Sequence, residues 1–174
     1  MFLAPYISGA GQLRGTLLGM SDGVRGIYQT IGAMRQLVNA YKTDLEIRQA
    51  AASAAFLTPE KDELAEVEAV FNFVRDHIRY LKDVNGVETL ATPDKTLMLQ
   101  YGDCDDQVTL LASMLESIGY PTWFVITGYS DPRIFEHVYM QVLVGNHWID
   151  LDPTEPHDMG YAPPDPVVIH VEAV

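Results

Sequence analysis

The hydrophobic spacing of the chain changes once, near Pro121, and this change limits the folds open to it. Before Pro121, apolar residues recur every three or four positions, as on one face of an α-helix. After it, residues 122–129 are rich in β-branched and aromatic side chains, which favour strands. Residues 137–144 and 147–151 flank Gly145-Asn146, a short turn typical of hairpins. Helices followed by an antiparallel sheet predict an α+β domain.

Three helices are expected between residue 58 and the sheet. Thr58-Pro59-Glu60 offers an N-cap, a proline at the first helical position and an acid in the first turn, so we expect a helix over 58–82. Thr92-Pro93-Asp94 starts a short helix in the same way. A longer helix runs from Cys104 to Ile118 and ends at Gly119.

The segment before residue 58 has a pattern of its own. Residues 1–20 are rich in glycine and small apolar residues and should form an irregular arm. Over 24–45 the apolar residues follow a strict 3-4 spacing, the seam of a coiled-coil helix. This long helix either lies on its own domain or packs on a protein partner or a second copy of the chain; a narrow seam suits a partner helix. The seam consists of Val24, Ile27, Ile31, Met34, Val38, Tyr41 and Leu45.

Composition and charge divide the chain into three parts. Residues 1–58 are an arm and helix for packing or assembly, 59–155 form the domain that carries the chemistry, and 156–174 are a proline-rich, extended strap. The formal net charge is −13, made up of +2 in residues 1–58 and −15 in the remainder. Nucleic acid and anionic membranes attract clustered Lys and Arg, so we expect neither as a partner.

The cysteine count and the apolar runs indicate a location. A single cysteine excludes an intrachain disulfide. The N-terminus lacks the basic region of a signal peptide, and no stretch reaches the ~20 apolar residues that span a bilayer. We therefore expect a soluble, cytoplasmic protein.

Cys104 lies between a glycine and a predicted helix. A thiol at a helix N-terminus faces unpaired N–H groups and the positive end of the helix dipole, and both favour the thiolate. Asp103, Asp105 and Asp106 oppose ionisation, so a reactive Cys104 needs a cationic neighbour. Without one, Cys104 is a structural cysteine. The three acids with His137 and Asp152 could also hold a hard metal ion, but acids at a helix start are commoner, and we expect no metal or cofactor.

His137 and Asp152 lie at corresponding distances on either side of the Gly145-Asn146 turn. Adjacent antiparallel strands bring such positions side by side. A histidine paired with an aspartate that fixes its tautomer is the base and orienting group of nucleophilic catalysis. Asp150 alternates in phase with Asp152 and remains a reserve candidate.

Three ordered segments carry a resemblance to a known family. Tyr-Gly-Asp-Cys-Asp-Asp at 101–106, His-Val-Tyr-Met-Gln-Val from His137 and Trp-Ile-Asp-Leu-Asp-Pro-Thr from Trp148 resemble the motifs of the transglutaminase-like superfamily, with its papain-like fold. The resemblance implies Cys104 as nucleophile, His137 as general base and later acid, and Asp152 as the orienting group. It also implies acyl transfer through a thioester. The N–H of Cys104 would stabilise the oxyanion, with Gln100 or Tyr101 as a second donor.

Departures from the family pattern bear on the reaction. In cross-linking members the segment around the nucleophile resembles Gly-Gln-Cys-Trp, whereas this chain has Gly-Asp-Cys-Asp. Family members also often carry Trp and Glu two and four residues after the histidine, where this chain has Tyr139 and Gln141. We therefore expect hydrolysis of a peptide or protein amide rather than cross-linking. The alternative is a structural or assembly protein that keeps the fold, because similar small proteins occur in tailed phages, and then the location is the virion.

Overall fold

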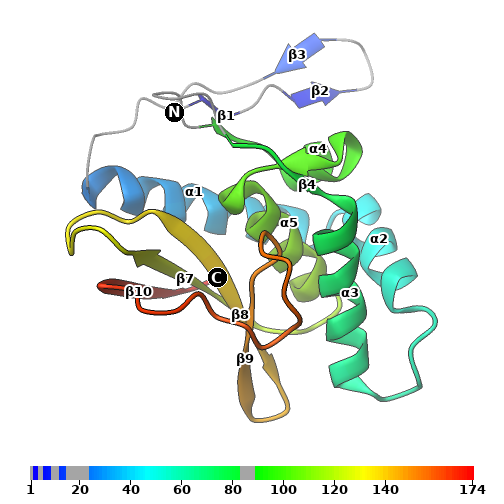
Figure 1. The fold of residues 1–174 in the computed structure, drawn as a ribbon. Helices are drawn as coiled ribbons and strands as arrows, with labels where there is room; N and C mark the ends of the chain where they lie inside the picture. The colour runs from blue at the N-terminus through cyan, green and yellow to red at the C-terminus, as the bar shows by residue number, and fades with distance from the viewer. Residues whose placement is uncertain (1, 4–5, 9–11, 15–23, 83–88) are drawn as a thin grey trace.

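The computed structural model describes residues 2–3, 6–8, 12–14, 24–82 and 89–174, with side chains described from residue 26 on. Helices come first and most of the sheet afterwards (Figure 1). The helices are α1 (Val24–Tyr41), α2 (Leu45–Ala55), α3 (Glu63–His77), α4 (Pro93–Leu99) and α5 (Cys104–Ser117). The short strands are β1 (Phe2–Leu3), β2 (Tyr6–Ser8), β3 (Gln12–Arg14), β4 (Arg79–Tyr80), β5 (Thr89–Leu90) and β6 (Tyr101–Gly102). The longer strands are β7 (Thr122–Gly128), β8 (His137–Val144), β9 (His147–Leu151) and β10 (Val168–Ala173).

The four longer strands form one antiparallel sheet in the order β10-β7-β8-β9. Strands β8 and β9 are joined by Gly145-Asn146, and Gly145 has a φ of +58°, which a hairpin turn of this length favours. The α+β prediction and the hairpin are confirmed. The C-terminal tail is more ordered than an extended strap, because residues 168–173 add to the sheet as β10, beside β7.

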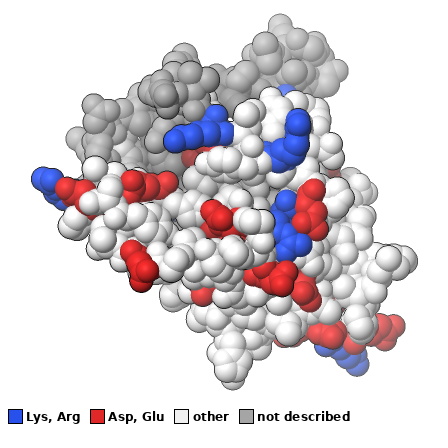
Figure 2. Space-filling view, viewed as in Figure 1, with Lys and Arg blue, Asp and Glu red and all other residues white. Residues whose placement is uncertain are grey.

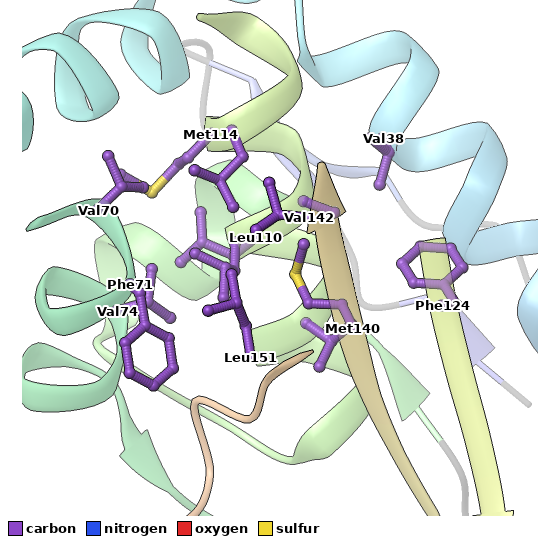
Figure 3. Packing of buried hydrophobic residues seen from close by; sticks show 14 of the residues in the cluster. Val38, Val70, Phe71, Val74, Leu110, Met114, Phe124, Met140, Val142 and Leu151 are labelled. Carbon is purple, nitrogen blue, oxygen red and sulfur yellow. The ribbon is translucent and has the colours of Figure 1, made fainter. Parts of the chain in front are cut away.

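The core lies between this sheet and the helices (Figure 3). Helix α5 is central, since it packs against α1, α2, α3 and α4 and also against β8. One face of the sheet and the inner faces of the helices meet there. The labelled core side chains are Val38, Val70, Phe71, Val74, Leu110, Met114, Phe124, Met140, Val142 and Leu151.

The predicted seam of residues 24–45 packs on the chain's own core. Ile31, Met34 and Val38 are buried there, and α1 lies along α5. A break at residues 42–44 separates α1 from α2, where Asp44 caps α2 and leaves Leu45 exposed. Of the two alternatives for this segment, the described side chains fit the helix that lies on its own domain. A contact with another chain, which stays a prediction, would use the outward face of α1.

Two boundaries differ from the prediction for residues 58–82. Helix α3 begins at Glu63, because Lys61 adopts a left-handed conformation and Asp62, not Thr58, accepts the capping hydrogen bond from the N–H of Ala65. The helix ends at His77, and the chain continues as the short strand β4. The predicted arm over residues 1–20 contains β1, β2 and β3, and its remaining residues lie outside the described residues, as does the loop over 83–88.

The connection between β9 and β10 joins opposite edges of the sheet, so it must cross the sheet. Figure 1 shows it passing β8. The N–H of Gly160 donates to the carbonyl of Asp150, and the N–H of Val167 donates to the carbonyl of Gly128. This connection begins with Asp152, and it fixes that residue beside the start of β8. None of the helices in the described ranges is both long and apolar enough to cross a bilayer.

Candidate active site

Cys104 is the first residue of α5, and the preceding residues fix its position. Asp103 caps the helix and accepts a hydrogen bond from the N–H of Asp106 over 3.5 Å. Gly102 is required before the cap, because a Cβ atom there would lie 2.6 Å from the Cβ of Asp106. The first N–H groups of a helix have no partner within the helix, and they carry its positive partial charge. The thiol of Cys104 therefore lies where a thiolate is favoured.

The three aspartates around Cys104 have separate structural roles. Asp103 is the N-cap, and Asp106 accepts a hydrogen bond from the N–H of Ala91 over 2.6 Å. Burial raises the pKa of Asp105 well above its usual value, and a hydrogen bond to Asp103 and the charges of Asp103, Asp106 and Cys104 raise it further. A raised pKa favours the neutral form of Asp105, which reduces the negative charge that opposes ionisation of the thiol.

His137 and Asp152 lie side by side, as expected from the hairpin. The Nε2–H of His137 donates to Oδ2 of Asp152 over 2.7 Å. Asp152 is only 2% exposed, and its other oxygen accepts from the N–H and the hydroxyl of Thr154 over 3.1 and 2.7 Å. Thr154 is a positioning residue that the sequence analysis missed, although Asp-Pro-Thr is a typical turn in which a side chain bonds the backbone two residues on.

The ring of His137 also lies close enough to Cys104 for the thiol to raise the pKa of the histidine. Because Nε2 is bound to Asp152, Nδ1 is the nitrogen that remains for the thiol. Burial lowers the pKa of His137, but the hydrogen bonds to Asp152 and Cys104 and the charges of both outweigh it and raise the pKa to about 10. His137 is therefore an imidazolium at neutral pH, the cationic neighbour that Cys104 requires.

Asp150, the reserve candidate, has another partner. Its Oδ1 accepts a hydrogen bond from Nε2 of Gln141 over 2.9 Å, and these two residues are paired between β8 and β9. Asp150 and Asp152 thus face the same side of the sheet, but only Asp152 bonds His137 among the hydrogen bonds of the described residues.

The two predicted oxyanion donors lie just before Cys104. Gln100 ends α4 in a left-handed conformation, and its carbonyl accepts from the N–H of Arg79. Tyr101 pairs with Arg79 in the parallel β4–β6 ladder, and Tyr80 pairs with Gly102. Tyr80 comes from the strand that follows α3, and no local pattern indicated that it would pair with Gly102.

A metal ion would find its closest set of ligands at the start of α5. Asp103, Asp105 and Asp106 offer oxygens that all lie within 4.8 Å of one another. This set does not include His137 or Asp152, which are bonded to each other. The capping role of Asp103 and the bond from Ala91 to Asp106 account for two of the three acids without an ion.

Charge is distributed widely over the molecule. Acidic side chains are spread over the face seen in Figure 2, and no continuous basic patch is visible on its described part. Arg75 lies next to Asp76 and Asp158, and Arg133 next to Asp131.

The family follows from the match of residues 50–153 to the model of the transglutaminase-like superfamily. The chain belongs to the transglutaminase-like superfamily. The match contains Cys104, His137 and Asp152, so the resemblance in the sequence motifs is confirmed at the level of the family. A relation to proteins of tailed phages stays a prediction.

Solved structures agree on the fold of this superfamily member. A candidate cysteine protease from Cytophaga hutchinsonii has a TM-score of 0.54 at 14% identity over 82% of this chain and 56% of its own. A candidate protease from Parabacteroides distasonis gives 0.54 and 14% over 90% of this chain and 36% of its own. LapG of Legionella pneumophila gives 0.51 and 13% over 80% and 87%.

These similarities support the fold and not a shared substrate. The chain spans 56% and 36% of the length of the first two chains. Among curated protein sequences, none matches the chain significantly.

Proposed function

We propose that this superfamily member is a thiol-dependent acyl-transfer enzyme that hydrolyses a peptide or protein amide through a thioester on Cys104. The observation that carries the proposal is the hydrogen bond from His137 to Asp152, together with the interaction of the same ring with Cys104 that raises the pKa of His137. It supplies a nucleophile, a base and an orienting group in contact. The likeness in fold to candidate cysteine proteases supports the same class of chemistry.

In the first half of the reaction, the thiolate of Cys104 attacks the amide carbonyl. A bond forms between sulfur and carbon, and the electron pair of the carbonyl moves to oxygen. The N–H of Cys104 stabilises this oxyanion. The imidazolium of His137 then gives its Nδ1 proton to the leaving nitrogen, the carbon–nitrogen bond breaks, and a thioester remains.

In the second half, neutral His137 acts as the base. Water attacks the thioester, His137 takes one of its protons, and the carbon–sulfur bond breaks to release an acid and the thiolate. Asp152 accepts hydrogen bonds from His137 and Thr154 throughout, and it holds the ring in place. Water is the favoured acceptor, since the glutamine and tryptophan that flank the nucleophile of cross-linking members are Asp103 and Asp105 here.

The test is acylation by p-nitrophenyl acetate, an activated ester that needs no specific substrate recognition. The wild-type protein should release a burst of one nitrophenolate per chain and carry one acetyl group on Cys104 by mass spectrometry. Cys104→Ser should show neither. If the wild-type protein gives no burst and no acetyl-Cys104, the proposal is wrong. Added hydroxylamine then reports whether an amine competes with water for the thioester.

A structural or assembly role in a particle, with Cys104 inactive, stays a prediction from the sequence. No described feature favours it over the enzyme, and α1 and α2 contribute to the core of the domain rather than projecting from it.

A further inference from the structure

We infer that two copies of this chain associate through the outer edges of β10, which pair antiparallel around a two-fold axis at Val171. The association is independent of the proposed acyl transfer, because β10 lies at the opposite edge of the sheet from β9, the strand that leads to Asp152. The partner is a second copy because β10 is complementary to itself in both its main-chain groups and its side chains.

Strand β10 forms one open edge of the main sheet. It pairs with β7 on one side, and no strand in the described ranges pairs with it on the other. Natural edge strands often carry lysine or proline, which hinder pairing with another chain. Residues 168–173 read Val-Ile-His-Val-Glu-Ala and contain neither. The outer edge of β10 therefore lacks the usual obstacles to main-chain pairing.

The hydrogen bonds to β7 show which main-chain groups point outward. The N–H of Val174 donates to the carbonyl of Thr122 over 3.3 Å, so β10 bonds β7 through every second residue counted back from Val174. The N–H of Leu143 donates to the carbonyl of Pro121, which gives β7 the matching phase towards β8. The N–H and C=O groups that point away from β7 belong to Ile169, Val171 and Ala173.

These outward groups match when β10 meets its own copy. With the two-fold axis at Val171, Val171 lies opposite its own copy and Ile169 lies opposite Ala173 of the second copy. Each outward N–H and C=O of the three residues then has a partner. An axis at Ile169 or Ala173 leaves some of these groups without one. An axis between two residues sets outward groups against inward ones.

The side chains agree with this register. The same axis places His170 opposite Glu172 of the second copy, on both sides of Val171. These are the pairs without main-chain hydrogen bonds, whose side chains lie closest together. An imidazole opposite a carboxylate is favourable, whereas two like charges are not. Nε2 of His170 lies 3.5 Å from Glu172 of its own chain, so acidic and basic groups alternate across the axis.

The edge carries little net charge in an otherwise acidic protein. A formal net charge of −13 makes two copies repel each other at most surfaces. Residues 166–174 include one acidic side chain, Glu172, and it accepts a hydrogen bond from Nη1 of Arg35 over 2.9 Å. The repulsion is therefore weak where the two strands would meet.

Both faces of the sheet continue the contact. Ile169 and Val171 are 55% and 41% exposed, and they share a face with Trp123, the partner of Ala173 in the β10–β7 ladder. Pairing joins this apolar strip to that of the second copy. On the opposite face, Tyr28 of α1 packs edge-on against His170, with ring centroids 5.2 Å apart. The outward side chains of α1 thus border the same edge, beside which the sequence predicted a second copy.

Sedimentation equilibrium of the full chain tests the association. Over about 1–200 μM, the range in which a micromolar dimer dissociates, the wild-type mass should rise from 19.4 kDa to twice that value. Val171→Lys sets two lysines against each other on the axis, so it should keep the mass of one chain. Val167→Lys is the matched control, because Val167 is 52% exposed and precedes β10. It should dimerise like the wild type.

Disulfide cross-linking tests the register, in a Cys104→Ser background. Val171→Cys should form a linked dimer under mild oxidation, because the two copies of this residue face each other within disulfide reach. Ile169→Cys is similarly exposed, but its copies lie four residues apart along the strands, about 13 Å, and should not link. The background lacks the candidate nucleophile, so the result does not depend on acyl transfer.

Three outcomes would overturn the inference. The first is a wild-type protein with the mass of one chain at every concentration. The second is a dimer that persists in Val171→Lys, since its interface would lie elsewhere. The third is cross-linking of Ile169→Cys in place of Val171→Cys. A monomeric protein that still forms acetyl-Cys104 would refute the dimer and leave the proposed function intact, so the two failures are distinct.

Discussion

Nε2 of His137 lies 2.7 Å from Oδ2 of Asp152, and this contact decides which ring nitrogen faces the thiol. With Nε2 committed to the buried carboxylate, Nδ1 is the ring nitrogen left for Cys104. The carboxylate itself is fixed by Thr154 through its second oxygen. Three side chains from a helix start, a strand start and a loop thereby act as one unit.

Replacing the orienting group should weaken that unit. In Asp152→Asn, the ring of His137 loses its negative partner and the tautomer that the carboxylate selects, so acetylation of Cys104 should slow at least tenfold. The nitrophenolate burst measures this rate. Asp150→Asn is the comparison, because Asp150 bonds Gln141 and not His137. A larger loss in Asp150→Asn would instead make Asp150 the orienting group.

The pKa of His137 gives the stability of the protein a pH dependence. The folded-state pKa is about 10, against an ordinary 6.5. The stabilisation from the protonated ring is therefore complete below about pH 6.5 and is lost as the pH rises through about 10. Urea unfolding should show the wild type losing at least about 1 kcal/mol over this range relative to His137→Gln. Parallel curves for the two proteins would contradict the raised pKa.

Asp105 should limit stability at neutral pH. Its pKa is raised by burial, by its bond to Asp103 and by neighbouring negative charges, so its contribution is favourable near pH 4 and declines as the pH rises. Asp105→Asn stays neutral and should raise the free energy of unfolding by about 1 kcal/mol at pH 7, with little change at pH 4. Asp165→Asn, at an exposed position, serves as the control in the same urea titrations. An equal gain in both variants would argue against a buried carboxyl effect.

The seam of α1 should behave as core. Met34 is 1% exposed, so Met34→Ala should lower the free energy of unfolding by about 2–5 kcal/mol. Leu45 belongs to the same predicted seam but is 69% exposed. Leu45→Ala should therefore change the free energy of unfolding by less than about 0.5 kcal/mol. Denaturant unfolding measures both. Similar small effects at the two positions would favour a helix that packs on another chain.

Local sequence patterns predicted the elements that hold the three candidate residues. Gly145-Asn146 fixes a two-residue hairpin, and the hairpin sets Asp152 beside His137 without any long-range information. Gly119, with a positive φ of 101°, ends α5 as expected, and Pro93 starts α4. Each of these depends on backbone restrictions that a single residue type imposes.

The remaining features depend on contacts that no local pattern encodes. Tyr80 is placed opposite Gly102 by a ladder of two residues per strand, which is too short to leave a periodic signal. A 3-4 spacing shows that α1 buries one face but not whether α5 or another chain covers it. The prolines of the tail predicted an extended segment without a sheet partner, so the strand over residues 168–173 that pairs with β7 was not expected. The raised pKa of Asp105 follows first from its burial, which no local pattern of the sequence shows.

The most direct test of the candidate site is the rate at which iodoacetamide labels Cys104 at pH 7, compared with the rate in His137→Ala. An imidazolium beside a helix N-terminus should make wild-type labelling about tenfold faster than that of an unstructured peptide thiol. Loss of His137 should abolish most of this advantage. Labelling of the wild-type protein at the peptide rate, unchanged by His137→Ala, would contradict an activated thiol and with it the assignment of Cys104, His137 and Asp152 as one site.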